Sequence, residues 1–420
     1  MTEVGNIRLT ERRPRTCRLR RDDLDFLLAH HRPHVDIEFT GERHRYRLTP
    51  RGYAGVIVTP NCRFVLRPKV ALADLLFLLN PDDDVLMAPD VGDGRVGGLF
   101  ELFAGRLARL LNERAAAGLH RGYAEQTAEL PFVRGRLNVS RQVRDSATAR
   151  RDRLHCRFDE LTADVACNRL VRAAAEQVAQ SPLLDEQVRA AVRHALVGLA
   201  EVGVEPATPE AFAHALADPA TAAYRPVLEL CQLLCSAATP GSITGQFPTS
   251  SFLIELEHLF ERYVTRGLVR HFAGSPIEIA VQPRISLPED SSTRPDLSLR
   301  PDVVLRADGR AAAVIDVKWK RLADAPEPAD LHQILAYASA LRCEHVALVY
   351  PGRRSRCRTY QIPGGPVRLA LHTLRVGGPR LKCRRSLERF ARALSEFPGE
   401  IRVKATSSRP EDLRNRAPAA

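Results

Sequence analysis

Short runs of alternating apolar and polar residues fill the first part of the chain and end at turn residues. Alternation is typical of strands that bury one face, so residues 35–50 and 54–69 are predicted to form strands. Residues 22–30 place acidic side chains ahead of an apolar stretch, as at a helix start. We therefore expect a small β-rich domain over residues 1–97. Its end is marked by the Asp- and Gly-rich segment 81–98.

Beyond residue 98 the apolar residues recur at helical spacing. A first helix is predicted to end at Gly118. Further helices are predicted over about 161–180, 184–203 and 222–237, and residues 98–240 are expected to form a helical middle domain.

A polar segment separates the first of these helices from the second and is rich in arginine. Its arginines could bind phosphates or an acidic partner, and they could equally form an exposed basic loop. Both interpretations stay open. The arginines concerned are Arg134, Arg136, Arg141, Arg144, Arg150, Arg151 and Arg153.

Residues 238–251 concentrate Gly, Pro, Ser and Thr and are predicted to be a linker. The expected third domain, 241–403, mixes helices and strands, and the tail 404–420 lacks apolar periodicity and is expected to be disordered. Its helices are predicted over about 252–272 and 329–341, and its strands over about 277–286, 298–306, 311–319, 345–350 and 356–361.

Composition narrows the class of protein. A chain of 420 residues exceeds one ordinary core, which agrees with an α+β multidomain fold. Neither a membrane-length apolar run nor a secretory signal is visible, so a cytoplasmic protein without membrane contact is expected. The nine cysteines form no CxxC pair or zinc-type cluster. The net charge of +12 suits a polyanionic partner, although a solvated basic surface explains it equally well.

Two Asp and one Lys stand inside segments that otherwise read as buried strands. If residues 307–309 form a three-residue loop, Arg306 pairs with Arg310 and Asp302 lies opposite Val314. Side chains alternate along a strand, so Asp302, Asp316 and Lys318 then project from one face. A two-residue loop would place the two Asp on opposite faces. The other Pro-Asp, at Asp296, falls about 13 Å from Asp316 in this register.

This grouping suits a hydrolytic metal site. Two converging carboxylates bind Mg²⁺, and the nearby Lys318 can orient a water molecule and stabilise negative charge at phosphorus. A structural Asp316–Lys318 ion pair is the alternative. Gln333 and Tyr337 lie four apart on one helical face, where they could support the site or be a surface pair. Glu261 could add a carboxylate or be a solvated helix residue.

Pro-Asp302, Asp316-Val317-Lys318 and Gln333-x-x-x-Tyr337 resemble the PD-(D/E)xK nuclease signature with its Q-x-x-x-Y extension. More narrowly, the chain resembles the McrC family, the nuclease subunits of McrBC modification-dependent restriction systems. The similar segments run in order over about 120–341 and read LPFVRGRLNVSRQ, CRFDELTADVACNRLVRAA, LEHLFERYV, LRPDVVL, VIDVKWKRL and DLHQILAYA.

The resemblance implies a C-terminal PD-(D/E)xK nuclease domain. It implies that Asp302, Asp316 and the carbonyl of Val317 ligate Mg²⁺, and that Lys318 serves the nucleophilic water. Gln333 and Tyr337 would support the site, and Glu261 would be a further carboxylate near the metal.

The resemblance also implies a partner and a role. An AAA+ GTPase ring would bind the N-terminal and middle regions, and this chain would stimulate GTP hydrolysis and cut double-stranded modified DNA in phage defence. The chain has no phosphate loop of its own, which agrees with a separate motor. A catalytically inactive adaptor and a stand-alone DNA repair nuclease remain alternatives.

Overall fold

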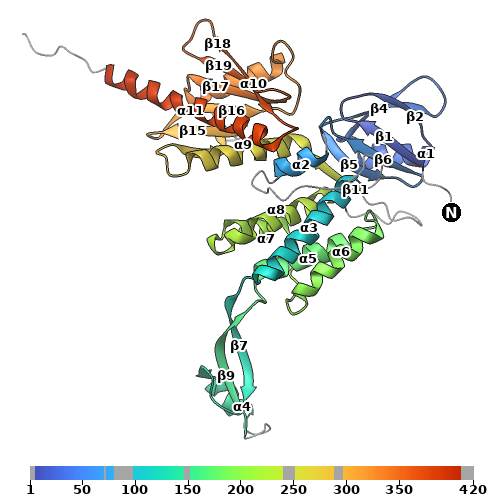
Figure 1. Cartoon of the computed structure of the whole chain (residues 1–420), viewed down its shortest axis with the longest axis vertical. Coiled ribbons are helices and arrows are strands. Elements are labelled where there is room, and N and C mark those ends of the chain that lie inside the picture. The colour runs from blue at the N-terminus through green and yellow to red at the C-terminus, as the bar shows by residue number, and fades with distance from the viewer. Residues whose placement is uncertain are drawn as a thin grey trace, which may run out of the picture. The chain divides into compact units, whose positions relative to one another are not determined.

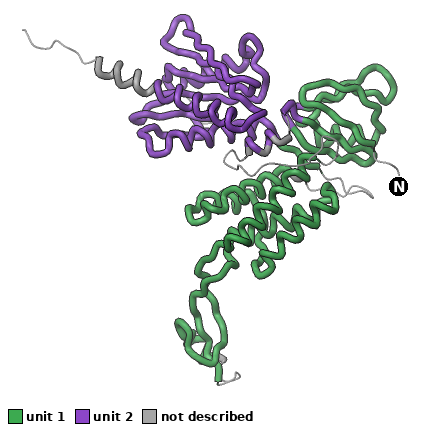
Figure 2. The backbone as a smooth tube through the Cα atoms, in the orientation of Figure 1, with its two compact units in different colours: residues 1–50, 54–67, 90–254 green, residues 51–53, 68–89, 255–420 purple. Residues whose placement is uncertain are grey.

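The computed structural model describes residues 5–70, 72–79, 98–145, 152–239, 251–287 and 297–407. The chain forms two compact units, drawn in separate colours in Figure 2. Unit 1 comprises residues 1–50, 54–67 and 90–254, and unit 2 comprises the remainder. The predicted α+β multidomain class is confirmed: β-rich and helical parts share unit 1, and a mixed α/β sheet lies in unit 2.

The β-rich part of unit 1 contains two sheets. A five-stranded sheet has the order β1-β6-β5-β11-β10, and a three-stranded sheet has the order β2-β4-β3. Apolar side chains such as Leu9, Ile57 and Phe64 fill its core. The elements are β1 (Gly5–Thr10), β2 (Arg15–Arg18), α1 (Arg21–His30), β3 (Val35–Phe39), β4 (Arg45–Pro50), β5 (Tyr53–Val58), β6 (Cys62–Arg67), β10 (Ala238–Thr239) and β11 (Ser251–Glu255).

The helical part of unit 1 packs α3, α5, α6, α7 and α8 together (Figure 1). Each helix buries one apolar stripe, as amphipathic helices do. The elements are α3 (Gly98–Ala117), α5 (Ala166–Gln180), α6 (Glu186–Leu196), η1 (Val197–Leu199), α7 (Pro209–Ala217), η2 (Pro219–Tyr224) and α8 (Arg225–Ala237).

An antiparallel hairpin extends from these helices and is here named the arm (residues 122–162). Its long strands β7 (Gly122–Leu130) and β9 (Leu154–Thr162) pair along their whole length, with β8 (Arg136–Leu137) and α4 (Val139–Asp145) at the far end (Figure 1). The helix predicted from residue 161 was therefore wrong at its start. Few of residues 154–162 are β-branched or aromatic, so the sequence gives little indication of a strand. Their pairing with β7, which is distant in sequence, decides their conformation.

Unit 2 is built on a six-stranded sheet with the order β12-β15-β16-β17-β19-β18. Strands β16, β17 and β19 are mutually parallel, and the others pair antiparallel. The strands of this sheet are β12 (Glu278–Val281), β15 (Val303–Ala307), β16 (Arg310–Val317), β17 (His345–Gly352), β18 (Arg356–Gln361) and β19 (Arg368–Arg375). Two further strands, β13 (Ile285–Leu287) and β14 (Leu297–Leu299), pair with each other in a separate two-stranded sheet.

Helices cover both faces of this sheet. Ile334 and Tyr337 of α10 pack on Val304, Val314 and the same face of β17 and β19. Helices α9 and α11 contact β16 on the other face, where Phe260 meets the ring of Trp319 edge-on. The helices of unit 2 are α2 (Leu72–Leu79), α9 (Leu256–Phe272), α10 (Pro328–Leu341) and α11 (Arg380–Ser407).

The β15–β16 hairpin corrects the predicted register. Its loop is the two-residue turn Asp308-Gly309, with φ of 51° and 74°, so Ala307 rather than Arg306 pairs with Arg310. A bulge then follows, because Leu305 pairs with Ala313 while Arg306 pairs with Ala311. The bulge inserts one extra residue on β16. It thereby returns Asp302 and Asp316 to the same face of the hairpin, which a two-residue loop alone would not do.

The consequence of the bulge lies at the other end of the hairpin. Val303 pairs with Ile315, so Asp302 reaches the level of Asp316 rather than that of Val314. The predicted diagonal placement of the two Asp was wrong, and their convergence on one face was right. The turn chemistry of Asp-Gly favours two-residue loops, and the bulge has no signature in the alanine-rich sequence.

Other predicted bounds change. Residues 251–255 form β11 in the unit 1 sheet, so the helix predicted from 252 begins at Leu256. The strand predicted over 277–286 is split into β12 and β13, and β19 and α11 were not predicted. Asp296, most of the linker and residues 408–420 lie outside the described residues. No helix in the described part of the chain is long and apolar enough to cross a membrane.

Candidate active site

The candidate site lies at the carboxyl end of β16, on the face that α10 covers. Val314, Asp316 and Lys318 alternate along the strand and therefore share this face, with Val314 packed in the core beneath α10. Asp316 is 1 % exposed, and a carboxylate is rarely buried this deeply unless it is paired. Asp302 precedes β15 and reaches the same strand end, where its Oδ2 accepts a hydrogen bond of 2.6 Å from the Val317 amide.

Burial and mutual repulsion dominate the electrostatics of the two carboxyls. Burial, and then the charge of Asp316, raise the pKa of Asp302 to about 7. Burial also raises the pKa of Asp316, although the ammonium of Lys318 opposes this effect. Two carboxyls that resist ionisation in the protein alone are stabilised in their charged form by a cation.

Lys318 is fixed by contacts on two sides. Its Nζ lies 2.8 Å from Oδ2 of Asp316 and donates a 2.9 Å hydrogen bond to Oε1 of Gln333. Burial lowers the pKa of the ammonium, but the charge and hydrogen bond of Asp316, together with the charges of Glu257 and Asp302, outweigh this effect and raise the pKa of Lys318. Lys318 is therefore a cation at neutral pH and is able to act as a charge and hydrogen-bond donor.

Gln333 and Tyr337 form a relay from α10 to the strand end. The Gln333 amide donates to the Tyr337 hydroxyl at 2.8 Å, and that hydroxyl donates to the carbonyl of Arg300 at 3.2 Å. The carbonyl of Arg300 lies two residues before Asp302 in the chain. This chain of hydrogen bonds thus links Lys318 to the backbone just before Asp302.

Glu261 approaches from α9 and is 9 % exposed, so it is not a solvated helix residue. Its Oε1 accepts a 2.5 Å hydrogen bond from Gln282, and its charge contributes to the raised pKa of Asp302. Six predicted side chains therefore lie in one neighbourhood: Glu261, Asp302, Asp316, Lys318, Gln333 and Tyr337. Val317, the residue after Asp316, joins them through the hydrogen bond from its amide to Asp302.

Gln282 was missed from the sequence. Its backbone amide donates to the carbonyl of Asp302 at 2.8 Å, its side-chain amide holds Glu261, and its oxygen accepts from Arg300. Its φ of 45° is unusual for a residue other than glycine, and such strain concentrates at functional sites. The polar Gln between two strand segments was the available signal.

A second missed group anchors the start of α10. Lys320 contacts Glu327 at 2.6 Å and Asp330 at 2.8 Å, and the Tyr350 hydroxyl donates to Asp330 at 3.0 Å. Asp330 lies one helical turn before Gln333, so this ion-pair group sets where Gln333 meets Lys318. The alternation of Asp316, Lys318 and Lys320 could have indicated it.

The donor set fits a divalent, oxygen-binding cation. Oδ2 of Asp316 is buried and faces the Lys318 ammonium at 2.8 Å, and a carboxylate oxygen has a second lone pair that a cation can use. Two carboxylates and a backbone carbonyl are ligands that Mg²⁺ uses, with water completing its shell. Within the described residues no three His, Cys, Asp or Glu side chains gather as a metal-binding cluster.

We expect Gln282→Asn to weaken the site without unfolding it. Asn tolerates the positive φ, but its shorter side chain cannot hold Glu261. Changes to groups that orient a metal site typically cost 10- to 100-fold, so the Mg²⁺ dependence of binding, followed by calorimetry, should shift to about tenfold higher concentration. The matched control is Gln361→Asn, because among the described residues the side-chain amide of Gln361, at the end of β18, donates to the carbonyls of Gly365 and Val367. Equal Mg²⁺ dependence in both variants would contradict a positioning role.

The fold and the site together define an α+β protein with a carboxylate–lysine centre at the end of a mixed sheet. The chain belongs to the McrBC family, because the sequence model of that family, described as McrBC 5-methylcytosine restriction system component, matches residues 48–351. None of the curated proteins matches the chain.

Two solved structures are similar to this chain. One is described as a refined half-complex from a tetradecameric assembly of Thermococcus gammatolerans McrB AAA+ hexamers with bound McrC. It has a TM-score of 0.56 and 17% identity, and the match covers 92% of this chain and 99% of that chain. The other is the Thermococcus gammatolerans McrBC complex, with a TM-score of 0.46 and 20% identity over 64% of this chain and 88% of that chain. The first match agrees with the fold described above.

Proposed function

We propose that this chain is the Mg²⁺-dependent DNA endonuclease subunit of a McrBC-like restriction system. It cleaves phosphodiester bonds of modified double-stranded DNA when bound to an AAA+ GTPase ring, whose GTP hydrolysis it stimulates. The observation that carries the proposal is the convergence of Asp302, Asp316 and Lys318 at the carboxyl end of β16. Family membership supports the restriction role.

Each group has a distinct task in this proposal. Asp302, Asp316 and the Val317 carbonyl hold Mg²⁺, which when bound acidifies water and offsets charge on the reacting phosphate. Lys318, held as a cation by Asp316 and Gln333, donates to a phosphate oxygen and stabilises the negative charge that develops there. Gln333, Tyr337 and Gln282 are positioning residues.

The arm is the proposed docking element for the ring. Exposed apolar patches on a soluble protein mark partner-binding sites, and large exposed apolar side chains gather on the arm. They are Tyr123, Phe132, Val133, Leu137, Val139, Val143 and Leu161.

Two arginines of the arm, Arg134 and Arg153, are engaged within it, which fits this role better than a phosphate-binding role. Arg134 lies over the ring of Phe158 and pairs with Glu160 at 3.3 Å, and Arg153 donates to the carbonyl of Glu129. Cations that are already used within the arm have less to offer a polyanion. Arg150 and Arg151 lie outside the described residues.

The proposal is tested by cleavage of a modified duplex by the chain together with its ring partner and GTP. Cleavage is expected with Mg²⁺ and not with EDTA, because the carboxylates alone cannot activate water. The inactive-adaptor alternative predicts GTPase stimulation without cleavage under the same conditions. The repair-nuclease alternative predicts cleavage without the ring.

The raised pKa of Asp302 predicts a pH-dependent Mg²⁺ affinity. Since the carboxyl holds a proton below about pH 7, Mg²⁺ must displace it there. The affinity measured by calorimetry should rise about tenfold per pH unit up to about pH 7 and then level off. Asp302→Asn should remove the binding and the slope, and a wild-type affinity independent of pH would contradict this assignment.

The same pKa has a consequence for folding. The folded pKa of about 7 lies above the unfolded value of about 3.9, so the folded state binds more protons between them. This group therefore lowers the stability of the metal-free protein as pH rises through that window. Asp302→Asn should flatten this loss in thermal unfolding followed between pH 5 and pH 8.

A further inference from the structure

A groove beside the first half of α11 is lined mainly by cations. Its volume is about 270 Å³, and the residues lining it are Arg354, Ser355, Arg375, Lys382, Arg385 and Arg389. Lys382, Arg385 and Arg389 are spaced three and four apart, so they follow one face of the helix. No Asp or Glu is among the described residues that line it.

The cations of the groove are presented to solvent on a fixed scaffold. Arg354, Lys382, Arg385 and Arg389 are exposed, whereas Arg375 is half-buried and donates to the carbonyl of Gly377 at 3.3 Å. Ser355 is held by a 3.1 Å hydrogen bond from the Ser386 hydroxyl. Arginine binds phosphate through two parallel hydrogen bonds, so four arginines and a lysine suit a chain of phosphates.

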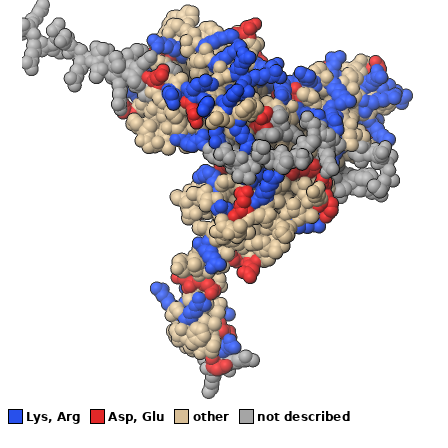
Figure 3. Space-filling model, in the orientation of Figure 1, with Lys and Arg blue, Asp and Glu red and all other residues tan. Residues whose placement is uncertain are grey.

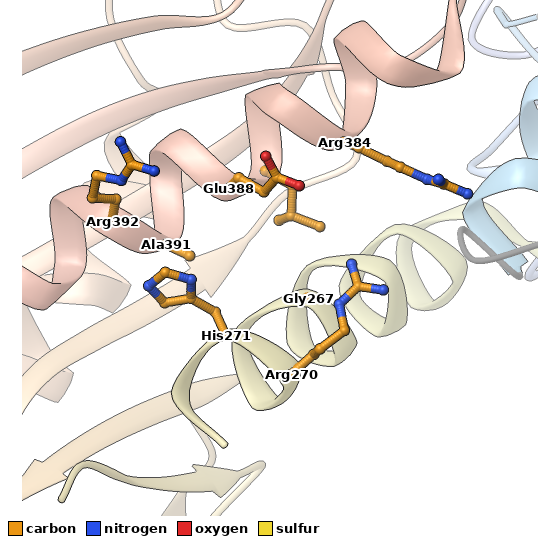
Figure 4. A pocket seen from close by; sticks show the side chains of 8 residues that line it. Gly267, Arg270, His271, Arg384, Glu388, Ala391 and Arg392 are labelled. Carbon is orange, nitrogen blue, oxygen red and sulfur yellow. The ribbon is translucent and has the colours of Figure 1, made fainter. Parts of the chain in front are cut away.

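A second groove on α11 provides a comparison. It lies between α9 and α11, has a volume of about 440 Å³, and includes Arg270, Arg384 and Arg392. Figure 4 shows the carboxylate of Glu388 on α11 between the side chains of Arg384 and Arg392. A carboxylate among the cations repels phosphate, so the groove at Arg385 and Arg389 is the better anion site.

The groove and the candidate active site lie at the same edge of the sheet. Strands β16, β17 and β19 are parallel, and Gly352 pairs with Arg375 at the carboxyl ends of β17 and β19. The backbone amide of Lys318 donates to the Val349 carbonyl near the same end of β17. Helix α11 packs on the sheet face opposite α10, and Arg375 of the groove lies at this edge, at the end of β19. With about 3.3 Å per residue and about 4.8 Å between strands, the backbone of Arg375 is roughly 10–15 Å from the end of β16. That distance is about three or four base pairs of duplex DNA at about 3.4 Å each.

We propose that this groove binds the sugar–phosphate backbone of the duplex DNA substrate a few base pairs from the cleaved bond. The proposal rests on the proposed nuclease function and adds a second contact with the same substrate. Lys and Arg side chains also gather on the visible face of unit 2, as Figure 3 shows, which favours a polyanion there. An acidic protein surface is the competing occupant that the experiment separates.

The experiment measures binding of a fluorescent 30-base-pair duplex to the full-length chain by anisotropy, at several salt concentrations and without Mg²⁺. The test variant is Arg385→Ala with Arg389→Ala, since Ala is a strong helix former at exposed positions. The control is Arg310→Ala with Arg342→Asn, which removes the same charge at the opposite edge of the sheet. Asn suits the left-handed conformation of Arg342, whose φ is 50°.

The wild type should bind the duplex with an affinity that falls steeply with salt. Each lost phosphate contact lowers the slope of log affinity against log salt by about 0.9, so the test variant should lose about 2 units of slope. Its affinity at about 0.1 M salt should fall at least tenfold. The control should keep the wild-type slope within about half a unit.

Equal losses in test and control variants, or no DNA binding by the wild type, would overturn the groove assignment. Loss of GTPase stimulation with unchanged DNA binding would also overturn it and assign the groove to a protein contact. These outcomes are separate from failure of the proposed function. If the wild type binds DNA through the groove but never cuts it, only the proposed nuclease function is contradicted. If the wild type cuts DNA and the test variant binds DNA as well as the wild type does, only the groove assignment is contradicted.

Discussion

Lys318→Ala is expected to reduce DNA cleavage by about 10²- to 10³-fold while the protein still folds and still stimulates its ring partner. Loss of one preorganised donor to the charge that develops in a transition state has an effect of this size. The ammonium is held between Asp316 and Gln333 and has no apolar packing role comparable with that of Val314. Single-turnover cleavage of a modified duplex measures the loss.

Mg²⁺ affinity distinguishes this role from metal ligation. Removing a cation beside Asp316 lowers the competition for its carboxylate, so Lys318→Ala should bind Mg²⁺ as tightly as the wild type or more tightly. Asp316→Asn should bind it more weakly. Wild-type cleavage rates in Lys318→Ala would contradict the role given to the ammonium, and unfolding of the variant would be detected as a lower melting temperature.

Phe132→Ser combined with Val133→Ser is expected to weaken binding to the AAA+ ring by about 100-fold. Both side chains are about 60% exposed on the arm, and apolar anchors at protein interfaces typically contribute 1–2 kcal/mol or more each. GTPase stimulation should fall in parallel, because the ring is reached only through docking. Titration of the ring with the chain, followed by GTP hydrolysis, gives the affinity.

Val197→Ser is the matched control for the arm. Val197 is 68% exposed in the short helix η1 of the same unit, so its replacement removes an exposed apolar side chain away from the arm. The control should bind the ring with the wild-type affinity. A normal affinity of the Phe132/Val133 variant would rule the arm out as the docking element.

The sequence predicted the face of the site better than its register. Alternation over Val314, Asp316 and Lys318 is a local property, so it survived an error in the loop. The turn and the bulge compensate for each other: the loop is one residue shorter than predicted, and the extra residue on β16 restores the facing. A bulge inside an alanine run has no side-chain signature, because packing against neighbouring strands decides it.

Contacts between segments distant in the chain account for what was missed. Gln282 joins Glu261 to Arg300, and nothing near Gln282 in the sequence reveals that pairing. The arm was interpreted as a polar loop because most residues of β7 and β9 are exposed or half-buried and show little apolar periodicity. Strongly periodic helices, such as α3 and α10, were located within a few residues of their ends.

The most direct test of the nuclease assignment compares two complexes that differ only at Asp316. Wild type and Asp316→Asn are each assembled with the ring partner, GTP, Mg²⁺ and the same modified duplex, and cleavage and GTP hydrolysis are followed together. We expect the wild-type complex to cut the duplex and the Asn complex to hydrolyse GTP at the same rate without cutting. Equal cleavage by the two complexes would contradict the assignment of the nuclease centre to the end of β16.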